Sequence, residues 1–447
     1  MLLRYWAVLG LIFMGLLMPA VYAGETYEFG LGNGLKIIVR EDHRAPVVAC
    51  QLWYKTGASY EQAGKTGLAH VLEHMMFKGT EKYPDGQFSQ IMADNGANEN
   101  AFTSSDYTAY VQKIEAKRLA INFELEADRM QNLQFNQEDF EKEQLVVIEE
   151  RRLRTDDKPV AALFELFHAT AFQTSPYHHP VIGWMNDIEQ LTVEDAKQWY
   201  QQWYTPNNAI LVVVGDVEPQ AVFELAKKYF AHIKPFAVEH LPTAKEVKQE
   251  GIKRVVLKRP AKIPQLVMGY KTPSIGPDSD PQDWHPYALE MLTWVLDGGD
   301  SARFSQQLVR GKELAASMST SYSLYQRLND LLMFSATPSK KSDVKQLEQA
   351  IKQQITEIQT TLVSEDELQR VKAQLTADIV FAKDSVFSQA YIIGQFEAID
   401  LPWHLYDSYL THINAITPEQ IREVAQIYLV DDGLTVAVLE PQNLSQE

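Results

Sequence analysis

The chain has 447 residues, a length that exceeds one ordinary domain and indicates at least two. Its 45% hydrophobic and 22% charged residues exclude a disordered or fibrous protein and are typical of a soluble globular one. A formal net charge of −18 repels phosphate backbones, so nucleic acid is excluded as a favoured partner, whereas basic or neutral polypeptides are compatible with this charge.

The first 23 residues differ from the rest of the chain. Arg4 precedes an apolar run at 6–18, Pro19 ends that run, and small residues stand before Gly24. This order is typical of a secretory signal peptide, and the run is shorter than the roughly 20 residues that span a membrane comfortably. We therefore predict that residues 1–23 are a signal peptide and that the protein is exported. An uncleaved leader that anchors the chain in the membrane is the alternative.

Strands are the first predicted elements after the leader. An Asn33-Gly34 turn joins strands at 27–29 and 35–39, and the apolar run at 47–54, which contains the only cysteine, predicts a third, buried strand. Long helical patterns follow. Strand hairpins followed by long helices predict an α+β fold, in which helices pack on one face of a mostly antiparallel sheet.

The segment His70-Val71-Leu72-Glu73-His74 is the sharpest motif in the chain. On a helix, His70 and His74 lie one turn apart on the same face, and Glu73 projects to the same side. Two neutral imidazoles with a nearby carboxylate suit a zinc ion. The alternative is a pair of histidines on a helix surface with an acidic neighbour.

A catalytic zinc ion needs a third protein ligand and an open position for water. The helical stretch 140–152 offers four candidates: Glu141, Glu143, Glu149 and Glu150. Glu143 and Glu150 are seven residues apart and share a helix face, but spacing alone does not choose the ligand. An acidic helix face exposed to solvent is the alternative interpretation.

The second half of the chain repeats the order of elements found in the first half. Thr192 opens a helical pattern that leads through a turn to a strand at 209–214, and Thr417 opens the same order 225 residues later, ending in a strand at 434–439. A repeat of this length indicates a duplicated domain, because solenoid units have periods of about 20 to 50 residues.

Proline and charge accumulate between the two copies, where the periodic patterns fail. We predict a signal peptide at 1–23, an N-terminal zinc-bearing domain at 24–235, a linker at 236–252 and a C-terminal homologous domain at 253–447. Where the second copy should present the zinc motif, at 285–291, the chain has no paired histidines.

The motif and its surroundings resemble the pitrilysin, insulysin and mitochondrial processing peptidase family of inverted zinc peptidases. The likeness extends over essentially the whole mature chain and is nearest to small bacterial members built from two homologous domains. Matching segments are 33–35, 57–61, 67–80, 100–103, 147–151, 176–177, 181–183 and 298–303. The resemblance implies that the two domains form half of a clamshell.

The resemblance also implies a role for each acidic and histidine residue of the motif. His70, His74 and Glu150 are expected to bind one zinc ion per chain, Glu73 to act as general base, and Glu143 to support the site from behind the ligands. The implied activity is that of a zinc endopeptidase acting on peptides or unfolded polypeptides. A non-catalytic scaffold or assembly subunit of the same family is the alternative.

The segment 98–103 resembles the edge strand with which the family binds substrate, by adding the peptide to the sheet as an extra strand. Asn100 and Ala101 are the residues expected to contact the substrate. Pairing through the backbone gives affinity with a loose sequence preference.

The resemblance is incomplete in the second half, which in the family supplies an arginine and a tyrosine that hold the substrate near the zinc ion. Arg310 matches the arginine, but the tyrosine position falls on Ala316 or Ser317. Either Tyr322 or Tyr325 replaces the missing tyrosine, or a homologous partner subunit supplies both groups. We predict the second arrangement, with this chain as the zinc-bearing subunit of a dimer and a heterodimer favoured over a homodimer.

Overall fold

The computed structural model describes residues 24–84, 86–238 and 245–442. The predicted signal peptide and residues 239–244 of the predicted linker therefore lie outside the described residues. Within the described ranges, no helix combines the length and the apolar character needed to cross a membrane.

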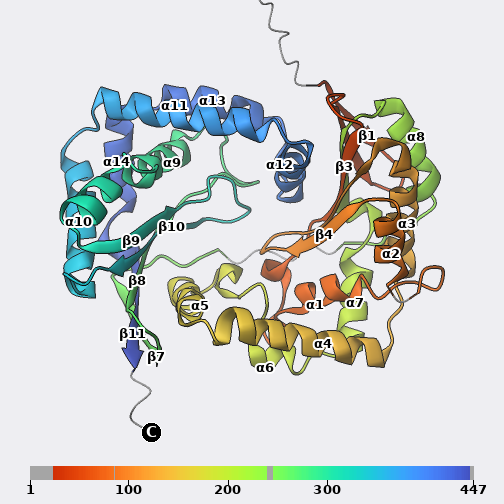
Figure 1. Cartoon of the computed structure of the whole chain (residues 1–447), viewed down its shortest axis with the longest axis horizontal. Helices are drawn as coiled ribbons and strands as arrows, with labels where there is room; N and C mark the ends of the chain where they lie inside the picture. Colours follow the sequence, from red (N-terminus) through yellow and green to blue (C-terminus); the bar gives the residue numbers. More distant parts are fainter. Residues whose placement is uncertain (1–23, 85, 239–244, 443–447) are drawn as a thin grey trace, which may run out of the picture.

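The described residues form two sheets, one in each half of the chain (Figure 1). The first has the order β1-β2-β6-β3-β5-β4, with β4 at an edge. All neighbouring strands are antiparallel except β2 and β6. Its strands are β1 (Thr26–Gly30), β2 (Lys36–Glu41), β3 (Val47–Tyr54), β4 (Asn98–Thr103), β5 (Thr108–Glu115) and β6 (Ala209–Gly215).

The second sheet has the order β7-β11-β8-β10-β9, with β7 and β11 as its parallel pair. Its strands are β7 (Lys253–Pro260), β8 (Gln265–Thr272), β9 (Ala315–Ser321), β10 (Asp330–Pro338) and β11 (Leu434–Gln442). The predicted α+β class with mostly antiparallel sheets is confirmed, and each sheet includes one parallel pair.

Helices surround both sheets. The first half contributes α1 (Leu68–Met75), α2 (Gln87–Asp94), α3 (Leu119–Asn132), α4 (Gln137–Arg151), α5 (Pro159–Ala171), α6 (Met185–Ile188), α7 (Val193–Trp203) and α8 (Pro219–Phe230). The second contributes α9 (Trp284–Asp297), α10 (Val344–Thr360), α11 (Glu365–Ala382), α12 (Val386–Ala398), α13 (Leu405–Ala415) and α14 (Pro418–Tyr428). Thr192 and Thr417 cap α7 and α14 in matching capping boxes, so both predicted helix starts are confirmed.

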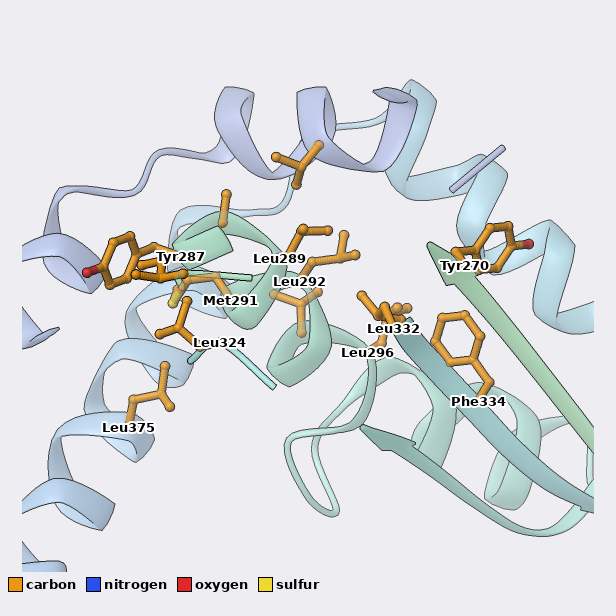
Figure 2. Packing of buried hydrophobic residues seen from close by; sticks show 14 of the residues in the cluster. Tyr270, Tyr287, Leu289, Met291, Leu292, Leu296, Leu324, Leu332, Phe334 and Leu375 are labelled. Carbon is orange, nitrogen blue, oxygen red and sulfur yellow. The ribbon is translucent and has the colours of Figure 1, made fainter. Parts of the chain in front are cut away.

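Leucines of α9 pack against β10 in the core of the second half (Figure 2). Leu292 and Leu296 are fully buried together with Leu332 and Phe334. This helix lies where the second copy would present the zinc motif, and its single histidine is His285.

Each sheet is covered on one face by helices of its own half and receives one further helix from the opposite half (Figure 1). Helix α12 packs on β3 and β6 of the first sheet, and α5 packs on β7, β8 and β11 of the second. Both contacts are close. A Cβ atom on Gly394 of α12 would lie 2.1 Å from the indole nitrogen of Trp53, and one on Gly269 of β8 would lie 2.5 Å from the ring of Phe167 in α5. The two halves are therefore interlocked through exchanged helices.

Candidate metal centre

Three predicted ligands from two helices converge on one point. His70 and His74 lie on α1 and Glu150 lies on α4, and their ligand atoms are all within 4.8 Å of one another. The Glu150 carboxylate oxygens lie 3.8 Å from Nε2 of His70 and 3.5 Å from Nε2 of His74. A single cation placed between these atoms could contact all three side chains.

Glu143 completes the arrangement from behind His74. Its Oε2 lies 3.2 Å from Nδ1 of His74, and its Oε1 lies 3.2 Å from the ammonium group of Lys78. The hydrogen bond with His74, together with Lys78, lowers the pKa of Glu143. Because an ionised carboxylate only accepts hydrogen bonds, Nδ1 of His74 is the donor in this contact, and Nε2 is the ring nitrogen that faces Glu150.

These residues fit zinc. Two imidazole nitrogens and one carboxylate oxygen, leaving a position for water, form a donor set typical of catalytic zinc sites, and a ligating histidine that donates its other N–H to a carboxylate is common in them. Burial, with a smaller contribution from His74, lowers the pKa of His70 to about 3, which keeps this imidazole neutral and able to bind a metal ion. Nδ1 of His70 is buried and has no hydrogen-bond partner among the described residues.

The other two acidic candidates on α4 point to solvent. The Glu149 side chain is 61% exposed and pairs with Arg152, and Glu141 is exposed and accepts a hydrogen bond from Gln137. Sequence spacing left four candidates, and the structure brings only Glu143 and Glu150 among them to the histidines.

Glu73 faces a cavity of about 310 Å³ beside the ligands. Its Oε2 accepts a 2.5 Å hydrogen bond from the hydroxyl group of Thr103, the last residue of β4. Burial raises the pKa of Glu73, against the effect of that hydrogen bond. The described residues that line the cavity all lie between positions 73 and 143 and include the predicted substrate contacts: Glu73, His74, Phe77, Lys78, Gly86, Asn100, Ala101 and Glu143.

The N-terminal end of α1 is held by Glu61. Its carboxylate accepts hydrogen bonds of 2.8 Å from the backbone N–H groups of Gly67 and Ala69. Gly67 has a positive φ of 88°, and a Cβ atom there would lie 2.7 Å from the carbonyl oxygen of Ile182. Glu61 and Thr103 fall in matching segments, but the sequence alone indicates no function for them, because contacts between separate segments leave no local pattern.

None of the predicted clamp residues Arg310, Tyr322 and Tyr325 is among the described residues that line the Glu73 cavity. Arg310 forms a 2.5 Å ion pair with Asp300. The hydroxyl group of Tyr322 donates to the carbonyl oxygen of Pro273 over 2.6 Å, and that of Tyr325 lies 3.5 Å from the hydroxyl group of Tyr287. A contact between Arg310 and substrate therefore stays a prediction.

Protein-family models match both halves of the chain. Residues 36–183 match the model described as insulinase, peptidase family M16, and residues 190–375 match the one described as peptidase M16 inactive domain. The chain is 31% identical over 424 residues to the zinc protease PqqE of Helicobacter pylori, with 94% of each chain covered. It is 23% identical over 409 residues to YmxG of Bacillus subtilis, named an uncharacterized zinc protease, with coverage of 92% of this chain and 97% of YmxG.

Solved structures share the fold. A protease from Helicobacter pylori matches with a TM-score of 0.88 at 30% identity and covers 94% of this chain and 100% of its own. A peptidase M16 inactive domain from Pseudomonas fluorescens matches with a TM-score of 0.83 at 15% identity and covers 94% of this chain and 98% of its own. The relatives' names associate the family with zinc and proteolysis. The chain belongs to peptidase family M16.

Proposed function

We propose that this protein is a zinc-dependent endopeptidase that hydrolyses peptides or unfolded polypeptides. The convergence of His70, His74 and Glu150 beside the Glu73 cavity is the observation that carries this proposal. When bound, a zinc ion would polarise the scissile carbonyl group and lower the pKa of its water toward about 7. His70, His74 and Glu150 would hold that ion.

Glu73 is the proposed general base. The Thr103 hydroxyl group donates a hydrogen bond to Oε2 of Glu73. We assign to the other carboxylate oxygen, Oε1, the transfer of the proton from water to the leaving amine. Edge strand β4 borders the same cavity through Asn100 and Ala101. A peptide that pairs with β4 would therefore pass beside Glu73, and its binding through the backbone would tolerate many sequences.

We further propose that a homologous partner subunit supplies the arginine and tyrosine that hold the substrate, in a heterodimer rather than a homodimer. Support comes from the second half, where Arg310 pairs with Asp300 and where Pro273 accepts the hydrogen bond of Tyr322. Export remains our proposal from the composition of residues 1–23. The likeness to small bacterial members of the family makes the bacterial periplasm the proposed destination.

A comparison of wild type with Glu73→Gln tests the activity. The variant should keep the wild-type zinc content and lose cleavage of an unstructured peptide by about 10² to 10⁴-fold, because only the proton acceptor is removed. Glu149→Gln, on the exposed face of α4, is the matched control and should keep both properties. A wild-type protein that binds no zinc and cleaves nothing, even with its paralogue present, would instead indicate a scaffold subunit.

The partner is tested separately, by affinity capture of the native protein and mass spectrometry of what is bound. A paralogous subunit should be captured, and its addition should raise the cleavage rate of the purified chain. Full activity of the chain alone, with no gain from the paralogue, would contradict the heterodimer.

A further inference from the structure

Arg327, in the loop between β9 and β10, reaches from the zinc-lacking half into the zinc-bearing half. Its Nε donates a 2.9 Å hydrogen bond to Oδ1 of Asp106, and its Nη2 donates a 2.7 Å hydrogen bond to the hydroxyl group of Ser59. The guanidinium carbon lies 4.3 Å from the ring centroid of Tyr60. The side chains of Arg327 and Asp106 are only 10% and 2% exposed, so this is a buried charge pair between the two halves.

Asp106 is fixed by further hydrogen bonds from its own half, and one of their donors also contacts the second half. Its Oδ1 also accepts the hydroxyl hydrogen of Ser59 over 2.7 Å, and its Oδ2 accepts that of Tyr177. The hydroxyl oxygen of Tyr177 in turn accepts a 3.2 Å hydrogen bond from the backbone N–H of Leu328, the residue after Arg327. Removing the guanidinium group would leave a buried carboxylate without its cation.

One connection leads from Arg327 to α1, the helix that carries His70 and His74. Ser59 and Tyr60, which the guanidinium group contacts, lie in a single helical turn at Ala58–Tyr60. The next residue is Glu61, whose carboxylate accepts hydrogen bonds from the backbone N–H groups of Gly67 and Ala69 at the start of α1. His70 directly follows Ala69. Arg327 therefore holds the segment that anchors the start of the ligand-bearing helix.

A second connection leads to the edge strand. The backbone N–H groups of Ala58 and Ser59 donate to the carbonyl oxygens of Ser104 and Ser105, over 3.0 and 2.7 Å. This loop directly follows Thr103, whose hydroxyl group contacts Glu73. Both connections therefore end at the proposed general base and the helix that carries it.

We propose that Arg327 is a positioning residue through which the zinc-lacking half aligns Glu73 with the metal ligands of its own chain. The inference rests on the proposed function and adds to it a contribution from the second half that is independent of any partner subunit. A residue that only joined the two halves would affect stability without affecting the metal site.

Arg327→Met tests this proposal against Arg303→Met. Arg303 is the matched control, because it is 13% exposed and makes two 2.8 Å hydrogen bonds to Glu367 within the second half. At a temperature well below either melting point, we expect Arg327→Met to lower kcat per bound zinc by at least about tenfold with KM within about twofold. Arg303→Met should leave kcat per bound zinc unchanged. An unchanged kcat in Arg327→Met, with only a lower melting temperature, would overturn the proposal.

Two further measurements separate this proposal from the proposed activity. The visible spectrum of the Co²⁺-substituted protein should differ from wild type in Arg327→Met and match it in Arg303→Met, and this readout needs no turnover. In Arg327→Gly, guanidinium ion at millimolar concentration should restore part of the lost kcat, whereas ammonium ion should not. If Arg327→Met does not fold, Arg327→Lys serves in its place and should give a smaller change of the same sign. Spectra identical to wild type in the variant that folds would count against positioning.

Discussion

The hydroxyl group of Thr103 donates a hydrogen bond of 2.5 Å to the carboxylate of Glu73, so the end of edge strand β4 directly contacts the proposed general base. Strand and base belong to different elements, and α1 also packs against β4. A peptide paired with β4 would thereby be placed in a fixed position relative to the group that moves the proton.

Thr103→Val should lower kcat/KM for peptide cleavage by about tenfold, because the variant keeps the shape of the side chain and loses the hydrogen bond that orients Glu73. Zinc content should not change. Thr103→Ser keeps the hydroxyl group and should retain most of the activity. Steady-state kinetics on both variants would test this, and equal values for Thr103→Val and wild type would contradict it.

Glu143→Gln should weaken zinc binding by about 10 to 100-fold, because the carboxylate that orients His74 becomes a neutral amide. Competition with a chromogenic chelator measures the affinity. Glu141→Gln, on the exposed face of the same helix, is the control and should bind zinc as the wild type does. A Glu143→Gln affinity equal to that of the control would show that Glu143 does not orient the ligand.

Gly394→Ala should reduce the free energy of unfolding by about 1 to 3 kcal/mol, because the added Cβ atom overlaps the indole ring of Trp53 where α12 crosses the first sheet. Gly30→Ala is the control, because a Cβ atom there meets no atom of the described part of the chain within 4 Å. Urea unfolding compares the two variants. Similar values would mean that the α12 contact can relax at little cost.

Glu246 should make the protein sensitive to acid. Burial alone would raise the pKa of Glu246, but Lys271 and the backbone N–H groups of residues 173–175 lower it from 4.5 to about 2. A pKa lowered in the folded state contributes stability above pH 4.5, and this contribution is lost as the pH falls from 4.5 toward 2. The wild-type melting temperature should therefore fall more steeply over this range than that of Glu246→Gln.

At pH 7, Glu246→Gln should be less stable than wild type by about 2 kcal/mol, since hydrogen bonds to a charged acceptor are lost. Glu250→Gln is the control, because Glu250 is exposed and lies 3.9 Å from Lys248. Melting curves of the three proteins at several pH values test the prediction. Parallel curves for wild type and Glu246→Gln would contradict it.

Local patterns predicted the parts of the fold that depend on neighbouring residues. Thr192 and Thr417 each cap a helix through a residue three positions later, so both starts could be recognised from the sequence. The same holds for His70 and His74, because one helical turn separates them. Glu150 could be chosen as the third metal ligand, from the four acidic candidates on its helix, only with the family resemblance. Sequence spacing alone does not distinguish the four.

Contacts between distant segments could not be predicted in this way. Arg327 and Asp106 are 221 residues apart, and neither lies in a recognisable motif. The apolar face of α5 predicts that the helix is buried, but its sequence does not specify the sheet on which it packs. The exchange of α5 and α12 therefore became visible only in the structure.

This exchange has a consequence for how the chain folds. Helix α5 packs against β11, the last strand described, as well as against β7 and β8, so part of its apolar surface is uncovered until almost the whole chain has been synthesised. Contacts of such large sequence separation slow folding, and the exposed surface favours aggregation or chaperone binding. Because each sheet also has a helix from the opposite half packed on it, both halves should unfold in one cooperative transition, and a protease cut between them should not release two stable domains.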